Sequence, residues 1–261
     1  MVLLNNRYEL AGKIGRGATS TVYQGRDTHT SRPVAIKILR RVYSTDPKRI
    51  VPFQRAGTIS RSLRHPNIVQ VLDSGLDGAD YYTIMELVEG GDLRQYALSA
   101  HNSMGVVEAV RIAHEVALGL GFAHGQRVIH GALKPQKILT GSGNSIKVAG
   151  FLSHNQFDRL IPGLTIYTSP EQVQTDPVSP ATDVYLLGTI LYELLVGHTP
   201  FARSTPEEVA LQHVSAMPRK PAECTPNLPP ALDEIVMKCL EKAPDERFHN
   251  GNELATVLKA V

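Results

Sequence analysis

The stretch Gly15–Val22 reads Gly-Arg-Gly-Ala-Thr-Ser-Thr-Val, and the stretch Val34–Lys37, shortly after it, reads Val-Ala-Ile-Lys. The glycines lie between two β-prone runs, which predicts the turn of a glycine-rich hairpin. Because the motif ends in a strand, it argues against a dinucleotide-binding unit, where the glycines open a helix. Lys37 follows the next apolar run, and it either contacts phosphate beside the turn or extends to solvent from a strand edge.

The periodicity of the chain changes near Gly90. Before it, β-prone runs dominate, with one helix-like segment, and after it the apolar spacing is helical. This pattern predicts an α+β chain with a strand-rich first part and a helix-rich second part. The expected strands are residues 8–15, 20–26, 33–39, 68–72, 81–88, 128–129 and 146–148, and the expected helices are 47–63, 106–123, 182–196, 206–216, 230–241 and 252–261.

Composition excludes several classes of protein. The formal net charge of +2 favours neither a nucleic-acid-binding nor a membrane-surface protein. Cys224 and Cys239 form no zinc-ligand pattern, which indicates a reduced, cytoplasmic compartment. The start of the chain lacks the pattern of a signal peptide. The longest apolar run, Val184–Gly197, contains Glu193 and is too short to span a bilayer, so we expect no membrane segment here.

The two opening motifs, together with others that follow in order, resemble the protein kinase family. His65–Val69 resembles the segment after the family's N-lobe helix, and Ser169–Glu171 resembles its Ala-Pro-Glu motif. Asp183–Gly188 resembles the start of its buried central helix. Arg247 matches the arginine that pairs with the glutamate of the Ala-Pro-Glu motif, here Glu171. The overall style is closest to bacterial Ser/Thr kinases.

The resemblance covers residues 8–260 and implies a bilobal, protein-kinase-like fold as a single domain over residues 1–261. A small β-rich N-lobe would end near residue 88, a hinge would span residues 86–92, and a larger helical C-lobe would follow. In the family, ATP binds between the lobes and the hinge backbone holds adenine. The matching positions, which could equally serve the fold alone, are Gly15, Gly17, Val22, Ala35, Lys37, Met85, Glu86, Val88 and Leu139.

The catalytic loop of the family, His-Arg-Asp-Leu-Lys-x-x-Asn, matches His130–Lys137, which reads His-Gly-Ala-Leu-Lys-Pro-Gln-Lys. Ala132 therefore stands at the position of the aspartate that accepts the hydroxyl proton, and Gly131 at that of the arginine. Lys137 replaces an asparagine that binds metal, and Gly150 replaces the aspartate of the Asp-Phe-Gly motif. An ammonium offers Mg²⁺ no lone pair and glycine has no side chain, so the resemblance implies no metal site.

Three further positions bear on catalysis. Ala56 matches the helix glutamate that pairs with the strand lysine, and residues 47–70 contain no Asp or Glu in any register. Phe151 is kept from the Asp-Phe-Gly motif, but Leu152 replaces its glycine, and Leu164 replaces the threonine that bridges to the catalytic loop. Without a neighbouring carboxylate, the Lys134 that persists in the loop is only a positive charge.

These departures favour a catalytically inactive pseudokinase, a signalling module that regulates partners. Two enzyme interpretations stay open: unconventional or residual ATP-dependent phosphotransfer, and an active kinase with compensating residues. A substitute acid would come from Asp92, Asp158 or Asp183. Because the kept cations Lys37, Lys134 and Lys137 can neutralise phosphate directly, we expect any ATP or ADP to bind without a metal. Lys137 either takes the role of the cation or points to solvent.

The expected partners are proteins: an active kinase, an attached domain or a phosphopeptide-binding domain. The last would bind a phosphorylated hydroxyl of the activation segment, such as Ser153, Thr165, Thr168 or Ser169. Ser169 has a simpler explanation as the N-cap of a short helix that begins at Pro170. We expect no nucleic-acid partner and a cytoplasmic location, free or tethered through regions outside this sequence.

Overall fold

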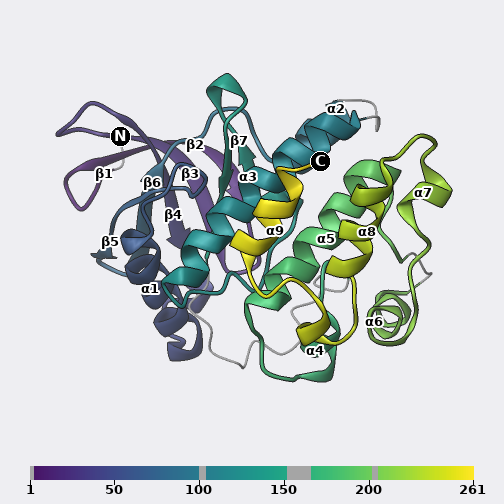
Figure 1. The fold of residues 1–261 in the computed structure, drawn as a ribbon. Helices are drawn as coiled ribbons and strands as arrows, with labels where there is room; N and C mark the ends of the chain where they lie inside the picture. The colour runs from purple at the N-terminus through teal and green to yellow at the C-terminus, as the bar shows by residue number, and fades with distance from the viewer. Residues whose placement is uncertain (1–2, 100–103, 152–165, 202–204) are drawn as a thin grey trace. The chain divides into compact units, whose positions relative to one another are not determined.

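The computed structural model describes residues 3–99, 104–151, 166–201 and 205–261. They form two compact units, residues 1–89 and residues 90–261 (Figure 1). The first is built mainly of strands and the second mainly of helices, which confirms the expected α+β, bilobal class. Among the described residues, no helix combines the length and apolar character that a bilayer crossing requires.

An antiparallel sheet forms the first unit, with strand order β1-β2-β3-β4-β6-β5. Its second and third strands are the arms of the glycine-rich hairpin, in which Gly15 pairs with Val22 and the Gly17 amide donates to the Ser20 carbonyl at 2.8 Å. The strands are β1 Leu3–Leu4, β2 Tyr8–Arg16, β3 Ser20–Asp27, β4 Pro33–Leu39, β5 Val71–Asp77 and β6 Asp80–Glu86.

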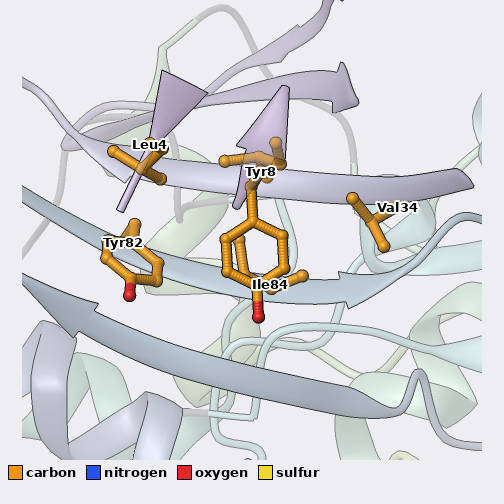
Figure 2. Close-up of a cluster of buried hydrophobic side chains, with 6 residues drawn as sticks. Leu4, Tyr8, Val34, Tyr82 and Ile84 are labelled. Atoms are coloured by element: carbon orange, nitrogen blue, oxygen red, sulfur yellow. The ribbon is translucent and has the colours of Figure 1, made fainter. Parts of the chain in front are cut away.

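The core of this unit lies on one face of the sheet, where alternate residues of neighbouring strands meet. Figure 2 shows Tyr8 of β2, Val34 of β4 and the pair Tyr82 and Ile84 of β6, all of them buried. The Tyr8 hydroxyl donates to Asp73 of β5 at 2.8 Å, so the one polar atom of this ring has a partner. The positions of β4 and β6 are therefore fixed by core packing as well as by the ladder.

Helix α1, Pro47–Ser62, packs against β5 and β6. Asp46 caps its start by accepting from the Lys48 amide at 3.0 Å, and a proline occupies the first turn. Gly57 allows a close approach, because a Cβ there would stand 3.2 Å from Ser74 Cβ and from Thr83 Oγ1. The helix is thus held at a defined depth over the sheet.

The second unit is organised around α5, Pro180–Val196, which is buried along nearly its whole length and packs against α3 and α8. Figure 1 shows where these helices lie within the helical unit. The other helices are α2 Leu93–Ser99, α3 Val106–Gly125, α4 Pro170–Gln174, α6 Pro206–Ser215, α7 Pro221–Cys224, α8 Pro230–Cys239 and α9 Gly251–Leu258. A two-stranded sheet of β7, Ile138–Thr140, and β8, Ile146–Val148, lies beside α3. Single turns of 3₁₀-helix are η1 Arg41–Tyr43, η2 Pro135–Lys137, η3 Ser142–Asn144 and η4 Pro244–Glu246.

Two expected strands need correction. Residues 128–129 form no strand, because the Val128 amide closes the end of α3 by donating to the Ala123 carbonyl at 2.9 Å. The strand expected at residues 68–72 lies instead at Val71–Asp77. It is an edge strand with polar residues such as Asp73, and these hide the apolar run by which a strand is recognised.

Candidate functional site

Eight of the nine expected nucleotide-contacting residues lie in the first unit, on the hairpin, on β4 or at the end of β6. Cross-strand pairing places Val22 opposite Lys37, and Ala35 opposite Met85. Glu86 ends β6, and its carboxylate accepts from the Gln70 amide at 2.8 Å, so that side chain helps to close the sheet. Leu139 lies on β7 of the second unit. Nucleotide contact by these residues remains a prediction.

Lys37 contacts an aromatic ring of α1. Its Nζ lies 5.4 Å from the centroid of the buried Phe53 ring, within the range of a cation–π interaction. Ala56, the position expected to replace a glutamate, lies three residues further along the same helix. The pKa of Lys37 is lowered by burial, which disfavours the charged form. The sequence identified the helix without acids but missed the ring, although residues three apart share a helix face.

In the second unit, residues 130–137 are held by a buried carboxylate of α5. Asp183 accepts from the His130 amide at 2.7 Å, from the Gly131 amide at 2.6 Å and from His124 Nε2 at 2.9 Å. Burial raises the pKa of Asp183, but His124, His130 and the Gly131 amide more than offset this, so the pKa is lowered. Asp183 therefore remains an anion that fixes the loop backbone.

The His130 side chain joins this loop to Ala149, the residue directly after β8. Its Nε2 donates to the Ala149 carbonyl at 3.1 Å, so Nδ1 carries no proton and accepts from the Ala132 amide at 3.2 Å. The ring also meets the buried Phe151 ring edge-on, with centroids 5.0 Å apart. The backbone around position 132 is thus held in one conformation.

A second set of contacts ties the loop to α4. Ser169 and Gln172 form a capping box at the start of α4, which confirms the expected capping role of Ser169. The Gln172 side-chain amide also donates to the Gly131 carbonyl at 2.6 Å. On the same helix, Glu171 forms a buried, two-pronged ion pair with Arg247, with both N–O distances 3.0 Å. This pairing was expected from the sequence.

The positions at which the family would bind a metal do not fit one. Gly150 has a left-handed backbone with φ of 81°, and a Cβ there would stand 2.8 Å from Lys137 Nζ. The side chain of Lys137 thus lies against Gly150, and neither residue supplies an oxygen ligand. Within the described residues, no group of three or more His, Cys, Asp or Glu side chains is placed to hold a metal ion. These two positions therefore supply no ligand to a metal ion.

Several expected residues lie outside the described part of the chain. They are Leu152, Ser153, Asp158, Leu164 and Thr165. Of the alternative acids within the described part, Asp183 binds the loop backbone, whereas Asp92 accepts from the Gln95 amide at 3.0 Å at the start of α2. Their contacts give both carboxylates a structural role.

Replacing Asp183 by asparagine is expected to lower the free energy of unfolding by about 2–3 kcal/mol, because one amide oxygen cannot serve three donors and the amide NH₂ would oppose one of them. Urea unfolding at neutral pH measures the loss. The matched control is Asp176→Asn, at an exposed position, and it should change stability by less than about 0.5 kcal/mol. Equal effects of the two variants would contradict the role given to Asp183.

The segment that leads into α4 is anchored by a buried histidine of α6. His213 Nε2 donates to the Ile166 carbonyl at 3.3 Å, and its Nδ1 lies 2.8 Å from the Tyr185 hydroxyl, which then acts as the donor. Tyr167 donates to Glu193 of α5 at 2.6 Å. These contacts fix residues 166–167 on the helical unit.

Acidification is expected to destabilise the chain through His213. Burial, and then the charge of Lys242, lower the pKa of His213 to about 4, below the ordinary 6.5. The unfolded chain therefore binds this proton first, and about 2–3 kcal/mol of stability is lost as pH falls from 6.5 to 4. Denaturant titrations at both pH values should show a smaller loss for His213→Gln than for the original chain. His249→Gln, at an exposed position, is the control and should lose as much as the original.

Comparison with known proteins gives a consistent result. The family model described as "Protein kinase domain" matches residues 8–257. The chain is 35% identical to the serine/threonine-protein kinase PknB of Mycobacterium leprae, over 96% of this chain and 42% of that protein. It is 32% identical to PrkC of Bacillus subtilis, over 98% of this chain and 40% of that protein. The chain thus spans about two fifths of these relatives' length.

A solved structure agrees. The crystal structure of the PknI kinase domain of Mycobacterium tuberculosis matches with a TM-score of 0.80 and 25% identity, over 99% of this chain and 97% of that one. This supports the expected fold and the resemblance to bacterial Ser/Thr kinases.

Two expectations are contradicted. The relatives are named serine/threonine-protein kinases, at 32–35% identity over nearly the whole chain, so the interpretation as an inactive, non-enzymatic pseudokinase is wrong. From the sequence, we favoured the inactive interpretation because we gave substitutions at single catalytic positions, such as Ala132, more importance than the similarity of the whole chain. The expectation that ATP or ADP binds without a metal is overturned by the same finding, since kinases of this class use ATP with a divalent cation.

Proposed function

Because the chain belongs to the protein kinase domain family, we propose that it is an ATP-dependent phosphotransferase with unconventional or residual activity toward protein hydroxyls. The observation that carries the proposal is the anchored catalytic loop. Asp183 binds the amides of His130 and Gly131, and His130 is joined to Ala149, so the loop keeps a defined backbone. Phosphoryl transfer depends mostly on positioning and charge, which such a frame can supply.

Three groups of this chain would contribute. In the first unit, Lys37 would neutralise phosphate charge and the backbone at the end of β6 would hold the adenine base. In the second unit, Lys134 would supply a further positive charge for phosphate. Position 132 supplies no carboxylate to receive the hydroxyl proton, a loss that typically costs about 10²–10⁴ in rate. We therefore expect turnover well below the roughly 1–100 s⁻¹ of ordinary protein kinases.

The partners that follow are protein substrates, and the activity would lie in the cytoplasm, where ATP is available. The relatives are longer than this chain, so the proposal does not include functions or partners of their other regions. The family and the names of the relatives support a protein acceptor, without defining its sequence.

Transfer of labelled γ-phosphate from ATP to generic protein acceptors and to the chain itself tests the proposal, with Mg²⁺ and Mn²⁺ in separate arms. We expect slow transfer that falls at least about tenfold in Lys37→Ala, since a phosphate-neutralising contact is lost. The matched control is Lys13→Ala, at an exposed lysine of β2, which should behave as the original chain. The absence of transfer by the original chain would exclude the proposed enzyme, whereas equal transfer by the original chain and Lys37→Ala would exclude the role of Lys37.

A further inference from the structure

The side chains next to Lys37 in the first unit carry no charge. Its cross-strand partners are Val22 on β3 and Thr83 on β6, and the helix packed over this part of the sheet supplies the Phe53 ring. No Asp or Glu occurs in α1, and within the described residues no carboxylate pairs with Lys37. Its ammonium instead lies over the face of the Phe53 ring, with Nζ 5.4 Å from the ring centroid.

The place of the ring is set by the helix rather than by the lysine. Phe53 is buried, and Gly57, one turn further along α1, brings the helix close to Ser74 and Thr83. Asp46 fixes the start of the helix. The ring is therefore a preorganised surface against which the ammonium rests, so that only the lysine side chain has to be ordered when the contact forms.

An aromatic face and a carboxylate hold an ammonium in different ways. A carboxylate neutralises the positive charge, whereas the ring attracts it through its quadrupole and carries no net charge. An ammonium on a ring therefore keeps its full charge for an incoming anion. Lys37 is half-buried, and this strengthens the effect because its surroundings screen charge less than water does.

We propose that Phe53 is the positioning partner of Lys37, and that its ring fixes the ammonium on β4 while leaving the whole positive charge for a phosphate group. The pairing itself stands on the first unit alone. The identity of the anion as a nucleotide phosphate rests on the proposed function.

A pH dependence follows from this pairing. The groups facing Lys37 from β3, β6 and α1 do not titrate, and burial lowers the pKa of Lys37. A bound phosphate raises that pKa again, because it favours the ammonium. At pH values above the pKa that Lys37 has in the nucleotide-free chain, nucleotide binding therefore takes up a proton. In that pH range, nucleotide affinity should fall with rising pH by up to tenfold per pH unit.

The pairing can be tested without a ligand, by following the Lys37 side chain with NMR of isotope-labelled lysine during a pH titration, with the signal assigned through Lys37→Arg. Phe53→Tyr keeps the ring and should keep the pKa of Lys37. Phe53→Leu loses the ring face and should lower that pKa further, because the ammonium loses an attraction. Phe53→Met is a second non-aromatic variant, in case leucine disturbs the helix. If both non-aromatic variants titrate like the original chain, the pairing is overturned.

The second arm measures affinity for ADP in the presence of Mg²⁺. Phe53→Leu should weaken binding by about 3- to 30-fold, the range that a desolvated cation–π contact allows, while Phe53→Tyr should not. If the NMR arm supports the pairing but the original chain binds no nucleotide, the proposed function fails and the assignment of the anion falls with it. If nucleotide binds equally to the tyrosine and leucine variants, the positioning role of Phe53 is overturned.

Discussion

Replacing Arg247 by methionine is expected to lower the free energy of unfolding by about 3–5 kcal/mol, the range for breaking a buried ion pair on one side. Arg247 is 2% exposed, and its guanidinium binds both oxygens of Glu171. It also donates to the carbonyls of Ala181, Glu241 and Lys242, so its loss leaves several buried acceptors without a donor.

The carboxylate left behind accounts for much of this cost. Burial raises the pKa of Glu171, and the hydrogen bonds and charge of Arg247 more than offset this, so the pKa is lowered in the folded chain. Without Arg247 the Thr182 hydroxyl, at 2.7 Å, is still a donor to a buried charge that no cation balances. Part of the loss should therefore be recovered by adding Glu171→Gln, which removes the charge.

Urea unfolding at pH 7 measures both variants, and the surface pair Arg219 and Glu223 supplies the control. Arg219 Nε lies 3.5 Å from Glu223 Oε2, and both side chains are exposed. Arg219→Met should therefore change stability by less than about 1 kcal/mol. A similar small change in Arg247→Met would show that the buried pair contributes little. Failure of Glu171→Gln to recover stability would place the cost in the lost carbonyl contacts instead.

Parts of the molecule that follow local rules could be predicted from the sequence. The glycine-rich hairpin, the strand Pro33–Leu39 that carries Lys37 and the long helices α3 and α5 lie close to where the apolar spacing placed them. The pair of Glu171 with Arg247 came from the family resemblance and is present. In these cases the pattern and the packing favour the same conformation.

The errors arose where a tertiary contact overrides local preference. Residues 128–129 are β-branched and apolar, but the Val128 amide completes α3, and the amides that follow bind Asp183. β7 was not among the expected strands, because its three residues are too few for an alternating pattern to show. At the candidate site, we considered from the sequence only Ala56, the position where a glutamate is missing. Lys37 instead contacts Phe53, and the packing of the helix places this ring near β4. A list of motif positions cannot show such a replacement.

Tertiary contacts also fix the backbone at position 132. We expect Ala132→Asp to raise the rate of phosphoryl transfer by about 10²-fold. The backbone there is already fixed, since the Ala132 amide donates to His130 and the adjoining amides bind Asp183. A carboxylate added to this frame could accept the hydroxyl proton without a change of loop conformation. Catalytic groups act as a unit, so the gain should stay at the lower end of the range while Lys137 and Gly150 are unchanged.

Initial rates of γ-phosphate transfer at saturating ATP measure the gain. Ala132→Asn is the matched control, because the amide has nearly the same size but cannot take up a proton. If asparagine raises the rate as much as aspartate, the gain comes from packing or hydrogen bonding and position 132 is not the place of a base. If Lys37→Ala abolishes the gain of Ala132→Asp, both residues serve one reaction. If the gain survives that change, the lysine on β4 and the loop at residues 130–137 do not act on the same phosphate.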